Sequence, residues 1–66
     1  MTINIGDMYN ITSLGYHATV TDILEDDDWR HTFVELEDTV TGYKHLVNVT
    51  NIHSPHYLNP TSMIKL

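Results

Sequence analysis

The sequence predicts a small all-β domain, and three observations support this prediction. Thr, Val and Ile account for 20 of the 66 residues, whereas Ala occurs once, and β-branched side chains favour strands. No window repeats apolar residues at the 3.6-residue spacing of an amphipathic helix. Residues 16–20 instead alternate, with Tyr16, Ala18 and Val20 on one side, as in a half-buried strand. We therefore expect strands and almost no α-helix.

Two strands are expected in the first part of the chain, over residues 7–12 and 16–24. The alternation of the second strand breaks at Asp22 and Ile23. A β-bulge at this point returns Ile23 to the buried side and adds the bend that a small barrel needs.

A hairpin is expected next, with a strand over residues 31–37 and a connection over 38–42. Gly42 occupies the position of the turn that needs a positive φ. If Glu37 pairs with Gly42, the residue numbers of each pair in the hairpin add up to 79, and if Asp38 pairs with Tyr43, they add up to 81. The two registers thus differ by two residues. Either register therefore assigns the same faces. Tyr43, His45, Val47 and Val49 are expected on the inner face with Val34 and Leu36, and Phe33, Glu35, Lys44, Leu46 and Asn48 on the outer face.

The remaining segment predicts one turn and one short strand. Residues 50–55 suit a short 3₁₀ turn, because Pro55 has no N–H to donate and disfavours a helical conformation at Ser54. A last strand is expected near residues 57–58 or 62–66.

Together these elements describe a single domain over residues 1–66, with a five-stranded barrel over about residues 6–58 and a C-terminal tail over 59–66. Four runs define this layout: Gly6-Asp7-x-Tyr9, Ala18-Thr19-Val20-Thr21-Asp22-Ile23, Phe33-Val34-Glu35-Leu36 and the run from Thr41-Gly42 to Val47-Asn48-Val49. On these residues the chain resembles the SH3-like barrels, including the Tudor and KOW types. This resemblance implies a fold and brings no catalytic or ligand motif.

Composition excludes several classes of protein. The chain has no Cys, so it has no disulfide, no Cys-based zinc site and no thiol nucleophile. The longest apolar runs are two residues, such as Ile23-Leu24, which excludes a transmembrane span or a secretory signal. We expect a cytoplasmic protein.

The charge of the chain argues against nucleic acid and anionic membranes as partners. Nine acidic residues stand against three basic ones, for a net charge of −6, and eight of the nine carboxylates fall within residues 22–38. A nucleic-acid binder normally carries a basic stripe, which this chain lacks and the KOW type has. Direct binding of nucleic acid or of an anionic membrane is therefore not expected.

The main candidate site is the acidic run Glu25-Asp26-Asp27-Asp28 with Trp29 directly after it. The run lacks the spacing and the Gly of a calcium loop. It is either a solvated acidic turn or an acidic loop that binds a partner, and Trp29 is either an interface anchor or a cap on one end of the barrel.

A second candidate is the outward pair Phe33 and Leu46, which forms an apolar contact surface between Glu35 and Lys44. The apolar tail 63–66 either covers such a surface or pairs as a strand with a neighbouring molecule, which allows a homodimer.

Five histidines are a high number for this length: His17, His31, His45, His53 and His56. The spacing of His53 and His56, with His45 as a third ligand, fits zinc or nickel. No nearby carboxylate or Cys completes the set, so we favour scattered histidines and expect no metal and no cofactor.

These features lead to two hypotheses of function. The first is a small, non-enzymatic, acidic protein-binding module, since no nucleophile motif is present and a barrel of this size offers no deep cleft. Small acidic barrels look like early bacteriophage proteins, so we expect a phage-type accessory or inhibitor protein that binds a basic or mixed surface of a host protein. If a phage encodes the chain, the expected compartment is the host cytoplasm. The alternative is a structural homo-oligomer that assembles through its outer strands and tail.

Overall fold

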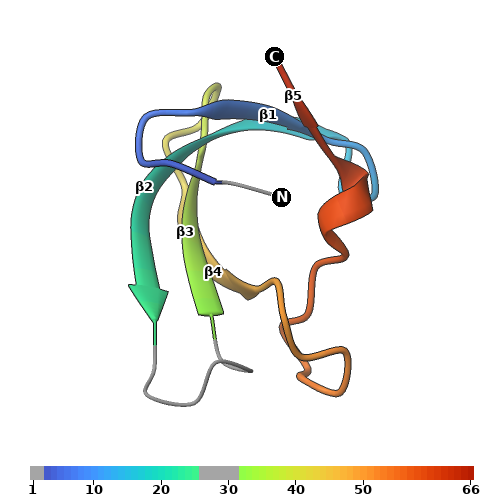
Figure 1. Cartoon of the computed structure of the whole chain (residues 1–66). Coiled ribbons are helices and arrows are strands. Elements are labelled where there is room, and N and C mark those ends of the chain that lie inside the picture. Colours follow the sequence, from blue (N-terminus) through green and yellow to red (C-terminus); the bar gives the residue numbers. More distant parts are fainter. Residues whose placement is uncertain (1–2, 26–31) are drawn as a thin grey trace.

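Five antiparallel strands form one curved sheet in the computed structural model, which describes residues 3–25 and 32–66 (Figure 1). The strand order is β4-β3-β2-β1-β5. The all-β prediction is thus confirmed. The strands are β1 (Met8–Ile11), β2 (Tyr16–Glu25), β3 (Thr32–Asp38), β4 (Lys44–Asn48) and β5 (Met63–Lys65).

The sheet is not closed into a barrel, so the predicted five-stranded barrel over about residues 6–58 is not confirmed. The last strand, β5, pairs with β1, and β4 is left at the opposite edge. Among the described residues of β4, Asn48 alone forms backbone hydrogen bonds with the returning chain: its N–H donates to the carbonyl of His56 (2.9 Å) and its carbonyl accepts from Leu58 N–H (2.8 Å). The chain between β4 and β5 therefore crosses the gap without a continuous ladder (Figure 1).

The predicted bulge in β2 is confirmed. The register between β2 and β3 shifts between Val20 and Asp22, so Thr21 has no residue paired opposite it on β3. After the shift, Ile23 lies opposite Val34 and packs against the core. The extra residue bends the ten-residue strand, as bulges do, so β2 curves from β1 toward the end of β3 (Figure 1).

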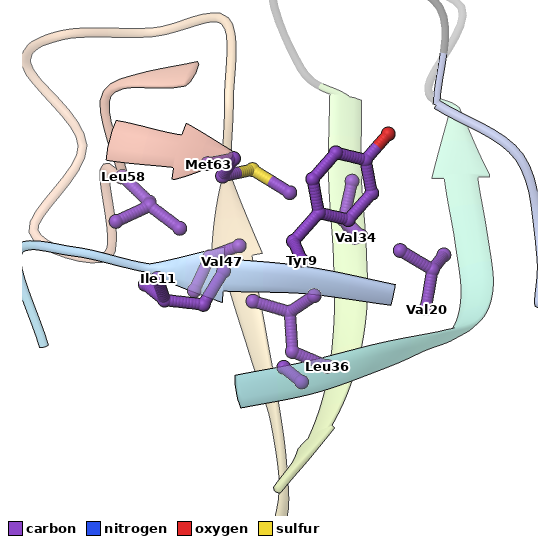
Figure 2. Close-up of a cluster of buried hydrophobic side chains, with 9 residues drawn as sticks. Tyr9, Ile11, Val20, Val34, Leu36, Val47, Leu58 and Met63 are labelled. Atoms are coloured by element: carbon purple, nitrogen blue, oxygen red, sulfur yellow. The ribbon is translucent and has the colours of Figure 1, made fainter. Parts of the chain in front are cut away.

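The core lies on the concave side of the sheet and includes residues from all five strands. Figure 2 shows these side chains converging from β1, from β3 and β4, and from the C-terminal segment. Period-2 alternation accounts for the strand members, because every second residue faces inward. The buried residues are Tyr9, Ile11, Ala18, Val20, Val34, Leu36, Val47, Leu58 and Met63.

The hairpin between β3 and β4 has the second of the two predicted registers, with Glu37 opposite Lys44 and paired residue numbers that add up to 81. Gly42 has the expected positive φ of 75°. Tyr43 is not on the inner face as predicted, because it precedes the first residue of β4 and is 68% exposed.

Asn48 also departs from the prediction, since it is buried rather than exposed on the outer face. Its side-chain Oδ1 accepts hydrogen bonds from the backbone N–H groups of Thr50 (2.9 Å) and Asn51 (2.8 Å). The chain returning at residues 56–58 covers it. Asn48 therefore holds the turn that ends β4.

The 3₁₀ turn lies at Pro60–Ser62 (η1) and not at residues 50–55, where the prediction was wrong. Residues 50–55 form turns begun by the Asn48 side chain. At η1, Asn59 Oδ1 accepts from Thr61 N–H (3.0 Å) and Pro60 supplies a favourable first residue. Nowhere in residues 3–25 and 32–66 is a helix long and apolar enough to cross a membrane.

We expect Asn48→Ala to lower the free energy of unfolding by about 1–3 kcal/mol, because two backbone N–H groups lose their acceptor in a partly buried setting. The measurement is urea denaturation followed by circular dichroism. Asn4→Ala is the matched control, since Asn4 is exposed and its side chain makes no hydrogen bond that the structure describes. Equal midpoints for the two variants would contradict the role given to Asn48.

Candidate functional site

The structure describes three of the seven residues predicted to bind a partner. Glu25 is exposed at the end of β2. Phe33 is half-buried on β3, and Leu46 is 42% exposed on β4. The other four, Asp26, Asp27, Asp28 and Trp29, lie outside the described residues.

Phe33 and Leu46 lie on the outer face of the hairpin. Both line one shallow depression of about 720 Å³. They are diagonal neighbours, because Leu46 pairs with Glu35 and Phe33 pairs with Asn48. We call this depression the outer groove. It is lined by Phe33, Glu35, Tyr43, Lys44, His45, Leu46 and His56.

The charge of the outer groove is set by Glu35. Thr21 Oγ1 donates to Glu35 Oε1 over 2.7 Å, so the bulge of β2 holds this half-buried carboxylate in place. Lys44 Nζ lies 3.7 Å from the carboxylate of Glu37, and both side chains are largely exposed. Such a pair adds little stability, but it offsets the lysine charge. The groove is therefore apolar with a fixed negative group.

An aromatic cluster borders the groove where β4 begins. Tyr16 Oη and His45 Nε2 are 2.7 Å apart, and the ring of Tyr43 stacks on His45 at 5.8 Å. Burial, followed by the negative charge of Asp38, raises the pKa of Tyr16 above its ordinary value. His45 Nδ1 is buried and has no hydrogen-bond partner.

The three histidines suggested as metal ligands are not brought together. His45 and His56 both line the outer groove, whereas His53 does not. Among residues 3–25 and 32–66, no three His, Cys, Asp or Glu side chains lie close enough together to hold a metal ion.

Sequence reasoning missed Tyr43 and His56 as parts of this surface. Tyr43 directly follows Gly42, and this turn position was a signal that it lies outside the strand register. His56 reaches the groove because the chain returns to Asn48, and no local pattern indicates that return.

Comparison with known proteins adds no assignment, since no family model, curated protein or solved structure matches the chain.

We expect Tyr16→Phe to reduce the loss of stability at alkaline pH. The raised pKa means that the unfolded chain loses the Tyr16 proton first, so this stability is complete below about pH 10 and disappears as the pH rises through the folded-state pKa. At about pH 8 the variant should be less stable by about 0.5–1.5 kcal/mol, because it lacks the hydrogen bond to His45. This difference should shrink toward about pH 11.

Urea unfolding at both pH values measures the effect. Some alkaline sensitivity should remain in the variant, because burial and the neighbouring Asp7 also raise the pKa of Tyr9. Identical pH dependence in wild type and Tyr16→Phe would contradict the role of Tyr16.

Proposed function

We propose that this chain is a small, non-enzymatic, acidic binding module that occupies a basic or mixed surface on another protein. The mode of action is that of a phage-type accessory or inhibitor protein acting on a host protein. The outer groove supplies the apolar contact and the acidic run from Glu25 to Asp28 supplies the charge. Trp29 serves as an anchor.

The outer groove is the observation that carries this proposal. Tyr43 and Leu46 are 68% and 42% exposed, and Phe33 lies beside them in the same depression. Clustered exposed aromatic and apolar side chains are typical of protein interfaces. The carboxylate of Glu35, which Thr21 holds in place, adds a specific position for a basic side chain of the partner.

Charge complementarity favours a basic partner. Both lysines of the described residues have a carboxylate neighbour, since Lys44 lies 3.7 Å from Glu37 and Lys65 lies 3.6 Å from Asp7. With a net charge of −6, the chain has a field that steers positively charged surfaces toward it and repels phosphate.

The acidic run and the outer groove begin at the same end of the β2–β3 pair. Glu25 is the last residue of β2, and its neighbour Leu24 pairs with Phe33. A partner that contacts Phe33 is therefore close to Glu25, where the acidic run starts. This proximity supports a single interface that combines steering charge with apolar contact.

We also propose that the fold is a partly open relative of the SH3-like barrels. The support is architectural: five short antiparallel strands, a bulged second strand and a 3₁₀ turn before the last strand.

Self-assembly is the second candidate function. It is favoured by β5, which forms the other edge of the sheet, and by the exposed side chains of Ile64 and Leu66 (52% and 60%). An exposed apolar edge strand can pair with a second copy. Analytical ultracentrifugation of wild type beside Ile64→Lys tests this candidate, which predicts an oligomer that the variant dissociates.

The test of the main proposal begins by capturing a partner from host-type lysate at low salt, followed by binding kinetics with that purified partner. We expect Trp29→Ala to weaken binding by at least about 2 kcal/mol, or roughly 30-fold, because truncating an aromatic side chain that anchors an interface is costly. Neutralising Asp26 to Asp28 should slow association and flatten its dependence on salt.

Val40→Ala is the matched control, since Val40 is an exposed apolar residue (90%) outside the outer groove, and it should bind as wild type does. Unchanged kinetics in both the Trp29 and the aspartate variants would remove the proposed mechanism. Recovery of the chain itself as the sole captured protein would favour self-assembly.

A further inference from the structure

The β4 strand has an unpaired edge. Two hydrogen bonds show which residues of β4 bond to β3. Asp38 N–H donates to the Tyr43 carbonyl (2.8 Å), and Val49 N–H donates to the Thr32 carbonyl (3.1 Å). In an antiparallel ladder alternate residues bond to the neighbour, so Lys44 and Leu46 direct their backbone groups away from β3. Within residues 3–25 and 32–66, no hydrogen bond reaches these groups.

The chain already uses the next position of this edge. Asn48 directs its backbone groups the same way, and they bond to His56 and Leu58 in the returning chain, with a parallel bridge to Tyr57. The edge is thus able to bind an extended segment. Its unfilled part runs from Lys44 to Leu46.

A second depression of about 450 Å³ lies beside the unfilled part of the edge, between β4 and the returning chain. We call it the edge groove. Its apolar lining includes Leu14, Val47, Pro55 and Leu58. It shares His45, Leu46 and His56 with the outer groove, so the two grooves meet at the β4 edge.

We propose that the β4 edge binds one extended, basic segment of the partner protein as an added strand. This inference rests on the proposed function and names the part of the partner that is recognised. Alternate side chains of a strand face opposite sides, so one set enters the apolar edge groove and the other faces the outer groove. Backbone bonding to Lys44 and Leu46 supplies the register.

Charge complementarity selects this occupant over a second copy of the chain. Glu35 pairs with Leu46, so its anchored carboxylate lies next to the edge on the outer face. A lysine or arginine on the outer side of the added strand meets this group. A second copy instead brings another net charge of −6, which opposes association.

The test uses a synthetic peptide of about eight alternating valines and lysines, a length that covers the edge. Two further peptides carry N-methyl groups on the valines or on the lysines, with the charge unchanged. We expect the parent peptide to bind at low salt in a titration followed by NMR. One methylated peptide should bind at least about tenfold more weakly and the other almost as the parent does, because only one edge of the peptide is used.

A protein variant tests the same bond from the other side. Leu46→Pro removes an N–H that the β3–β4 ladder does not use, and proline is tolerated on such edges. We expect it to weaken binding of the parent peptide at least about tenfold, whereas Leu46→Val, which keeps the N–H, should change it less than about threefold. Circular dichroism checks the fold, and the methylated peptides decide the question if Leu46→Pro does not fold.

Each other result overturns the inference. Equal binding of all three peptides indicates attraction by charge alone. If no peptide binds while the captured partner still binds, the partner uses another surface. In this case, and in the case of equal binding, the proposed function stands without the added strand. Absence of any peptide or partner binding contradicts both proposals. Dimers that the peptide dissociates identify a second copy as the occupant.

Discussion

The bulge at Thr21 is the constraint on which the rest of the structure depends. It bends β2, the strand that pairs with β1 on one side and with β3 on the other. The bend allows one short sheet to enclose its own core, which a flat sheet of this size does not do. Thr21 also donates to the carboxylate of Glu35, so the residue that bends the sheet positions the charged group of the candidate site.

The path of the chain after β4 determines what the bent sheet leaves open. Leu58 and Met63 reach the core and complete it (Figure 2), but within β4 the described backbone bonds to the returning segment are limited to Asn48. The fold therefore obtains its buried apolar surface without closing the β4 edge. The partly unpaired edge, the two adjoining grooves and the anchored carboxylate of this acidic chain support the proposal that it binds a basic strand.

Much of the hairpin was predictable, because local rules determine it. Alternation placed Val34, Leu36 and Val47 inside and Leu46 outside, and Gly42 marked the turn. The same rules do not specify the long return of the chain, so the burial of Asn48, the site of the 3₁₀ turn and the open edge were missed. In the candidate site, the bond between Tyr16 and His45 joins residues 29 positions apart, a separation at which no sequence spacing is informative.

The open β4 edge is tested most directly by amide hydrogen exchange along β4 in the free protein. If the edge is unpaired, the amides of His45 and Val47 should exchange slowly, because they bond to β3, and those of Lys44 and Leu46 should exchange at nearly the rate of an unstructured chain. Protection of all four amides would contradict the open edge and indicate that the protein's own chain or a second copy covers β4.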